Sequence, residues 1–171
     1  MTSKLILNNV LRWFVLLFIQ ILLLRNLSFY ELATPFPYVL FLLLLPFRLP
    51  NLLLYLIAFG TGLTLDAFYD TLGVHASACV TLVFVRIQFI SISVNRDNFD
   101  ESEPTLGNMG FRWFSFYSLL CIFSHHLVLF LLEAFKLSEI GYTLMRCLMS
   151  GLFTLVVILL IEFIFYNRKL R

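Results

Sequence analysis

Charged residues are scarce in this sequence. Asp, Glu, Lys and Arg make up 13% of its 171 residues, whereas hydrophobic residues make up 61%, and the mean hydropathy is +0.95. A soluble domain is closer to half apolar, so this composition indicates a protein of the lipid bilayer. The gaps between apolar segments are too short for a soluble catalytic domain, and a net charge of +2 does not suggest nucleic-acid binding.

Motifs for catalysis and metal binding are also missing. The sequence contains no HExxH, GxSxG, Walker A or rhomboid-like serine motif. Cys79, Cys121 and Cys147 lie in apolar stretches without CxxC spacing, which predicts small core residues. His125 and His126 point about 100° apart on a helix, so they cannot form an i, i+4 metal pair, and we expect at least one to be buried and hydrogen-bonded. We therefore expect no enzyme, no metal site and no cofactor.

Six apolar segments are candidates for membrane spans, each of which takes about 20 mostly apolar residues. They cover residues 9–27, 36–47, 52–69, 74–94, 113–132 and 140–165. The second is short because prolines at 35, 37, 46 and 50 bound it, and proline disfavours helix at and just before its own position. We expect a short or proline-broken span there rather than a re-entrant hairpin. The sequence thus predicts a single all-α transmembrane domain, residues 1–171, with six helices.

The basic residues are distributed asymmetrically over these segments. With both termini in the cytoplasm, only Arg25 and Lys136 lie at outer ends, as the positive-inside rule expects. The basic residues at the inner ends are Lys4, Arg12, Arg48, Arg96, Arg112, Arg168, Lys169 and Arg171. A five-span arrangement would place the basic C-terminal tail outside, so six spans are favoured. The first apolar run lacks a small-x-small cleavage site, which predicts an uncleaved anchor.

The most distinctive stretch runs from Gly60 to Ala76, GTGLTLDAFYDTLGVHA, at the junction of the third and fourth helices. Asp66 and Asp70 are one helical turn apart and share a face. We expect Asp70 to be solvated in the connecting turn. Asp66 is expected to be buried with a partner, because a charge deep in a membrane costs at least about 2.5 to 3.5 kcal/mol. Arg146, at a similar depth in the last helix, is the preferred partner.

Small residues surround these carboxylates. Ala58 and Gly62 have the small-xxx-small spacing that lets helix backbones approach closely. Packing within the chain is the favoured interpretation, and an interface with a partner is the alternative. Gly73 is expected to make the sharp turn into the fourth helix, which would present Asp70 and His75 together at the outer rim.

Three further polar features have open interpretations. Arg86 lies in the middle of the fourth span, where it could snorkel towards water or meet backbone carbonyls and Gln20. Glu162 is expected to face the basic tail. The polar stretch at residues 95–112 carries Asp97, Asp100, Glu101 and Glu103. It is expected to be a solvated linker, with contact to a basic cytoplasmic partner as the alternative.

One resemblance to a known family covers residues 36–86. The proline-bounded FLLLLPFRLP, the helix end LIAFGTGLTLDAFYDTLGVHA and the following SACVTLVFVR together resemble the rod shape-determining protein MreD family of bacteria. The resemblance implies a small inner-membrane protein that binds an MreC-like periplasmic scaffold. It also implies a link to the actin-like MreB, to RodA and to a penicillin-binding transpeptidase, and so a role in lateral peptidoglycan synthesis. No activity or cofactor comes with it.

The same family is similar in architecture to the S components of vitamin transporters, which are also six-span proteins. This suggests an alternative function, a substrate-binding component of a small-molecule transporter. S components share an Ala-x-x-x-Ala element in the first helix, and VLRWFVLLFIQILLL has no alanine. An intramembrane enzyme would need a nucleophile and a base within reach, which nothing in the sequence suggests. We therefore expect an assembly factor whose apolar grooves and outer rim hold a partner's membrane anchor.

Overall fold

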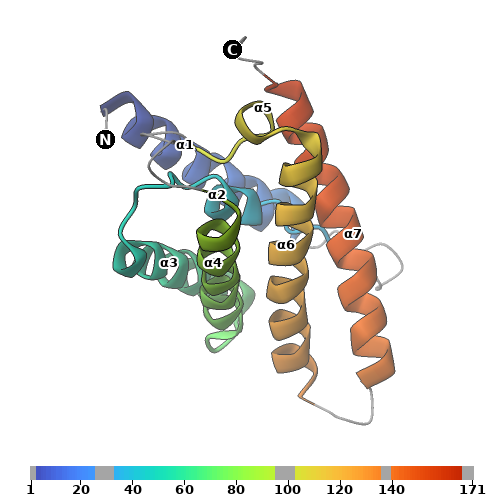
Figure 1. The fold of residues 1–171 in the computed structure, drawn as a ribbon. Coiled ribbons are helices and arrows are strands. Elements are labelled where there is room, and N and C mark those ends of the chain that lie inside the picture. The colour runs from blue at the N-terminus through green and yellow to red at the C-terminus, as the bar shows by residue number, and fades with distance from the viewer. Residues whose placement is uncertain (1–2, 26–32, 95–102, 136–139, 167–171) are drawn as a thin grey trace.

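The computed structural model describes residues 3–25, 33–94, 103–135 and 140–166, and this part of the chain is helical throughout its regular structure (Figure 1). Its long helices are α1 (Ser3–Ile19, continued by the π-helical turn η1, Gln20–Leu24), α3 (Asn51–Tyr69), α4 (Val74–Ser93), α6 (Phe111–Ala134) and α7 (Ile140–Ile164). Two short helices, α2 (Val39–Leu43) and α5 (Leu106–Met109), connect them.

The five long helices are each long and apolar enough to cross a bilayer. Large side chains such as Leu7, Phe18, Leu56 and Leu160 are exposed on the outside of the bundle, as lipid-facing residues are in a membrane protein. The chain is therefore an all-α, multi-pass membrane protein. The three cysteines are buried and form no disulfide, which confirms their prediction as core residues.

The second predicted span is broken by its prolines, which is one of the two forms expected for it. Its only helix is α2, whose five residues rise about 7.5 Å, so no continuous helix covers 36–47. Residues 34–36 are not helical, because the prolines at 35 and 37 remove backbone donors and disfavour helix. The segment nevertheless lies at the centre of the bundle, where Val39, Leu42 and Leu43 have no exposed surface.

The helices α1 and α3 run parallel to each other. Contacts join Trp13 to Thr61, Gln20 to Tyr69 and Arg25 to Asp70, at chain separations of 48, 49 and 45 residues. A nearly constant separation means that both helices proceed in the same direction. The chain must therefore return along the bundle before α3 begins.

Residues 33–47 make this return. Tyr38 contacts His125 of α6, and Leu43 contacts Tyr117 of the same helix, so the segment runs antiparallel to α6. The helix α4 packs between α3 and α6, and α6 packs along α7 (Figure 1). The short α5 segment joins the first and last helices, because Glu103 bonds to Asn9 and the Leu106 N–H bonds to Glu162.

Candidate functional site

Asp66 binds the first turn of α4. Its Oδ1 accepts the backbone N–H of His75 at 2.9 Å, and its Oδ2 accepts the N–H of Ala76 at 3.0 Å. The Thr71 hydroxyl donates to the same carboxylate, and the side chain of Asp66 is 5% exposed. The first N–H groups of a helix lack partners within the helix and carry a partial positive charge. Asp66 supplies those partners, which offsets the cost of burying its charge.

The predicted ion pair between Asp66 and Arg146 is wrong. The Nη2 of Arg146 lies 3.4 Å from Oε1 of Glu133, and its guanidinium lies 4.6 Å from the centre of the Phe130 ring. Arg146 is thus engaged on α6, whereas the carboxylate of Asp66 is occupied by the start of α4. The negative charge of Asp66 is compensated by backbone N–H groups close to it in the chain. The sequence had suggested that Arg146 would compensate it.

Asp70 and His75 do not lie together at an outer rim, which corrects a second prediction. Asp70 ends α3 with φ 56°, and its side chain is 87% exposed and 3.3 Å from Nη2 of Arg25. This agrees with the expected solvated turn position. His75 instead points inward, with its Nδ1 3.2 Å from Asp66 and its ring 4.8 Å from that of Tyr69.

The small residues serve packing within the chain, as the favoured interpretation predicted. A Cβ at Gly62 would lie 2.3 Å from the Cα of Ala76, so α3 and α4 can touch here only through glycine. Ala58 is fully buried. Gly73 has φ +81° at the start of α4, which confirms the predicted turn. Gly60 is different, since a Cβ there would meet nothing within 4 Å.

Side chains of α7 satisfy the backbone at the start of the buried return segment. The N–H of Thr34 donates to Oγ of Ser150, and the N–H of Phe36 donates to Oγ1 of Thr154, both at 3.0 Å. A buried backbone N–H without a partner is costly in a membrane. These two hydroxyls therefore allow non-helical backbone inside the bundle.

The two histidines of α6 belong to the same network, and both are fully buried. His125 Nε2 lies 2.6 Å from the Tyr38 hydroxyl, and His126 Nε2 lies 3.1 Å from Oγ1 of Thr154. The Ile122 carbonyl can only accept, so the Nδ1 of His126, 2.8 Å away, carries a proton. The expectation of a buried, hydrogen-bonded histidine is confirmed for both.

Arg86 and Tyr117 hold the other end of the return segment. Arg86 donates to the carbonyl of Leu45, and the Tyr117 hydroxyl donates to the carbonyl of Leu43 at 2.8 Å. Of the alternatives open for Arg86, the structure selects backbone carbonyls. No motif predicted Tyr38, Tyr117 and Thr154 as partners, although the proline-rich segment was a signal that unpaired backbone groups would need side-chain partners.

Among the acidic residues at the N-terminal end of α1, Glu103 differs from its prediction. Glu103 is not a solvated linker residue, because it bonds to Asn9 at 2.7 Å and to Arg12 at 3.0 Å. Glu162 accepts the N–H of Leu106 at 2.8 Å. Its predicted partner, the basic tail at 167–171, lies outside the described residues, as do Asp97, Asp100 and Glu101.

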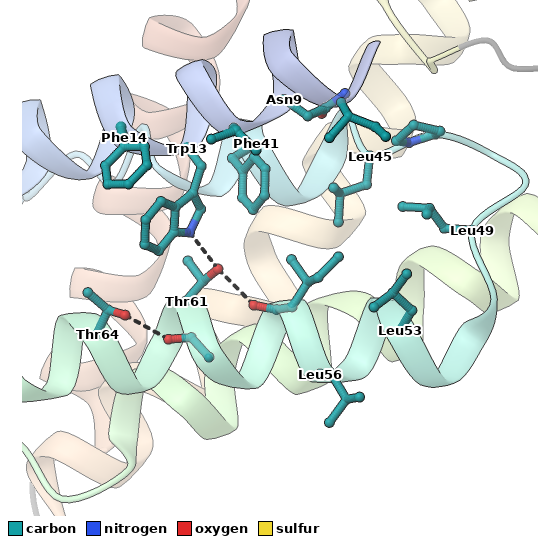
Figure 2. A pocket seen from close by; sticks show the side chains of 15 residues that line it. Asn9, Trp13, Phe14, Phe41, Leu45, Leu49, Leu53, Leu56, Thr61 and Thr64 are labelled. Atoms are coloured by element: carbon teal, nitrogen blue, oxygen red, sulfur yellow. Dashed lines mark hydrogen bonds between the residues drawn. The ribbon is translucent and has the colours of Figure 1, made fainter. Parts of the chain in front are cut away.

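An apolar groove of about 720 Å³ lies between α1, α2 and α3 (Figure 2). Trp13 projects from α1 across it, and its Nε1 donates to Oγ1 of Thr61 at 3.0 Å. The turn that leads into α3 passes around one end of the groove, where Leu49 lies (Figure 2). Its lining residues are Ile6, Asn9, Val10, Trp13, Phe14, Phe41, Leu45, Pro46, Leu49, Leu53, Leu56, Ile57, Gly60, Thr61 and Thr64.

These contacts define what the described residues can do chemically. The buried imidazoles, hydroxyls and guanidinium hold the return segment in place. Among the described residues, no group of three or more His, Cys, Asp or Glu side chains could hold a metal ion. The features open to other molecules include the groove and the exposed apolar helix faces. Comparison of the chain with protein-family models, with curated proteins and with solved structures gives no match.

Proposed function

We propose that this chain is a non-enzymatic membrane component of the bacterial cell-elongation machinery, of the MreD type. It binds an MreC-like periplasmic scaffold and helps to organise lateral peptidoglycan synthesis, in contact directly or indirectly with MreB, RodA and a penicillin-binding transpeptidase. The proposal begins from the resemblance of residues 36–86 to the rod shape-determining family. The structural observation that carries it is the filled centre of the bundle.

The centre is filled by the chain's own return segment. Residues from Tyr38 to Leu45 are each at most 6% exposed, and the polar groups around them bond to the Tyr38 hydroxyl and to the Leu43 carbonyl. A protein that captures a polar vitamin needs a central cavity with convergent polar groups. The space available to such a cavity is occupied here by Phe and Leu side chains. This supports a docking protein over the alternative of a substrate-binding transporter component.

The same segment supports a six-crossing topology in the inner membrane, with an S-component-like arrangement and both termini in the cytoplasm. Because residues 33–47 return between the parallel helices α1 and α3, we propose that they form the second crossing as a broken, internally buried passage. Non-helical backbone is tolerated at membrane depth when protein surrounds it. The inward bias of basic residues favours the same orientation.

We assign the docking of the partner's anchor to one face of α1 and its continuation η1. Leu7, Leu11, Phe18 and Leu22 repeat at helical spacing and are 61–66% exposed. They form one stripe that rises about 22 Å along the helix, most of the hydrocarbon thickness. A transmembrane helix packed along this stripe would be in contact over nearly its whole span.

Cysteine cross-linking tests this assignment. Leu11→Cys and, as a control, Leu160→Cys on α7 place single thiols at similarly exposed positions, 61% and 58%, while the native cysteines are buried. The chain should co-purify with a single-span periplasmic coiled-coil protein and cross-link to its anchor from position 11 but not from 160. Equal cross-linking from both positions would contradict the docking face. Failure to co-purify with any such protein would contradict the proposed function.

A further inference from the structure

The polar side chains that line the groove between α1 and α3 form their hydrogen bonds within the protein. The Trp13 indole N–H is used by Thr61, whose hydroxyl donates to the Ile57 carbonyl at 2.8 Å, and the Thr64 hydroxyl donates to the Gly60 carbonyl at 2.9 Å (Figure 2). The amide of Asn9, the other polar residue of the lining, donates to the Leu5 carbonyl at 3.0 Å and to Glu103 at 2.7 Å. With these donors bonded inside the protein, the remaining lining is hydrocarbon and aromatic. The complementary ligand is an apolar chain.

The length of the groove distinguishes a lipid chain from a helix. On α3 the lining runs from Leu53 to Thr64, a rise of about 16 Å, and on α1 from Ile6 to Phe14, a rise of about 12 Å. The hydrocarbon core of a bilayer is about 30 Å thick, so the groove matches one leaflet. A transmembrane helix would extend well beyond it, whereas an acyl chain from the nearer leaflet would not.

The charges near one end of the groove indicate the kind of head group. Lys4 and Arg48 are both exposed and are close in the chain to the lining residues Ile6 and Leu49. Arg12, next to Trp13, is paired with Glu103 at 3.0 Å. The two exposed basic side chains favour a negatively charged lipid.

Gly60 keeps the groove open. It lies on the groove side of α3, and a Cβ built on it would meet nothing within 4 Å. This contrasts with Gly62, where the absence of a side chain allows α3 and α4 to touch. The missing side chain at position 60 leaves space for a ligand rather than for another helix of this protein.

We propose that this groove binds one acyl chain of an anionic phospholipid from the leaflet at the N-terminal ends of α1 and α3. The bound acyl chain fills the gap between α1 and the rest of the bundle. Trp13 and Phe14 contact it from α1, and Leu53 and Ile57 contact it from α3. The inference requires only that the chain is a membrane protein and does not depend on a role in cell elongation.

Photocrosslinking in nanodiscs tests the proposal. The purified full chain is placed in phosphatidylethanolamine containing phosphatidylglycerol with a diazirine on one acyl chain, and labelled residues are mapped by mass spectrometry. We expect labels concentrated on groove residues. Gly60→Leu should lower groove labelling about tenfold, the loss expected if leucine displaces two methylene groups. Gly141→Leu, at another exposed helical glycine whose Cβ meets nothing within 4 Å, should leave the labelling unchanged.

Three results would overturn the proposal. Equal groove labelling of the Gly60→Leu variant and the native chain would mean that the lipid only surrounds the protein. Equal labelling by phosphatidylcholine with the same photoreactive chain would exclude selection of an anionic lipid. In native membranes, cross-linking of Gly60→Cys to a second polypeptide instead of lipid would show that a protein helix occupies the groove. Thermal unfolding of both leucine variants confirms that they are folded before labelling is compared.

Discussion

Asp66 and His75 lie 9 residues apart in the chain, and the carboxylate of the first accepts the backbone N–H of the second at 2.9 Å, inside the bundle. The side chain of Asp66 thereby caps α4 from the end of the preceding helix, and the αL turn at Gly73 brings the two together. The most distinctive stretch of the sequence is thus a joint between two helices.

The Asp66→Asn substitution tests this joint. An amide nitrogen would replace one of the two acceptor oxygens and face an N–H group, so we expect the free energy of unfolding to fall by about 1 to 3 kcal/mol. Thermal unfolding in detergent, followed by tryptophan fluorescence, measures the change. Asp70→Asn is the matched control, and because its side chain is 87% exposed it should change the stability by less than about 0.5 kcal/mol. Rescue of Asp66→Arg by Arg146→Asp would contradict the capping role.

The two glycines of α3 should respond in opposite ways to alanine. Gly62→Ala places a Cβ against the backbone of Ala76, so α3 and α4 must separate, and we expect a loss of about 1 to 3 kcal/mol. Gly60→Ala enters open space and replaces a helical glycine, so it should be neutral or stabilise by up to about 1 kcal/mol. Both variants can be compared by the same unfolding assay. Equal effects would mean that α3 and α4 are not in contact at Gly62.

Thr154 is expected to be essential for the buried return segment. Thr154→Val keeps the shape but leaves the Phe36 N–H and His126 without their partner, which should cost about 1 to 3 kcal/mol. Thr154→Ser retains the hydroxyl and should recover most of the stability. Limited proteolysis at residues 33–50 provides a local readout, since only the valine variant should become sensitive there. Similar sensitivity of both variants would contradict the role of the Thr154 hydroxyl, because the serine variant retains it.

The direction of the return segment can be tested by thiol labelling. With residues 33–47 crossing the membrane, Arg48→Cys should be labelled from the same side as an N-terminal tag. Leu72→Cys, which is fully exposed between α3 and α4, should be labelled from the opposite side. If the segment merely entered and left on one side, Arg48 would lie opposite the tag and Leu72 on the same side as the tag.

The helical part of this fold could be predicted closely where local signals were strong. The predicted spans at 52–69 and 74–94 differ by one residue from α3 and α4, because Pro50 starts one helix and Gly73 starts the next. The prolines also identified the second segment as irregular. Its final form depends on partners from α6 and α7 such as His125 and Thr154, which lie 87 and 118 residues away from their contacts. No local pattern specifies such pairings.

The candidate site was predictable in its burial but not in its pairings. Asp66 is buried, as expected, yet its partners are backbone amides, which have no signature in the sequence. Arg146 was a reasonable partner by depth alone, but depth does not determine which face of α7 it occupies. The groove depends on how α1 and α3 pack against each other, which is a tertiary feature that the sequence does not specify locally.

Controlled depletion of the protein in its host cell tests the central proposal most directly, with cell shape recorded by microscopy. We expect rods to become round as lateral wall synthesis loses its organisation, and the native chain to restore the rod shape. Cells that remain rods after depletion but lose uptake of a vitamin would contradict it and favour the transporter alternative.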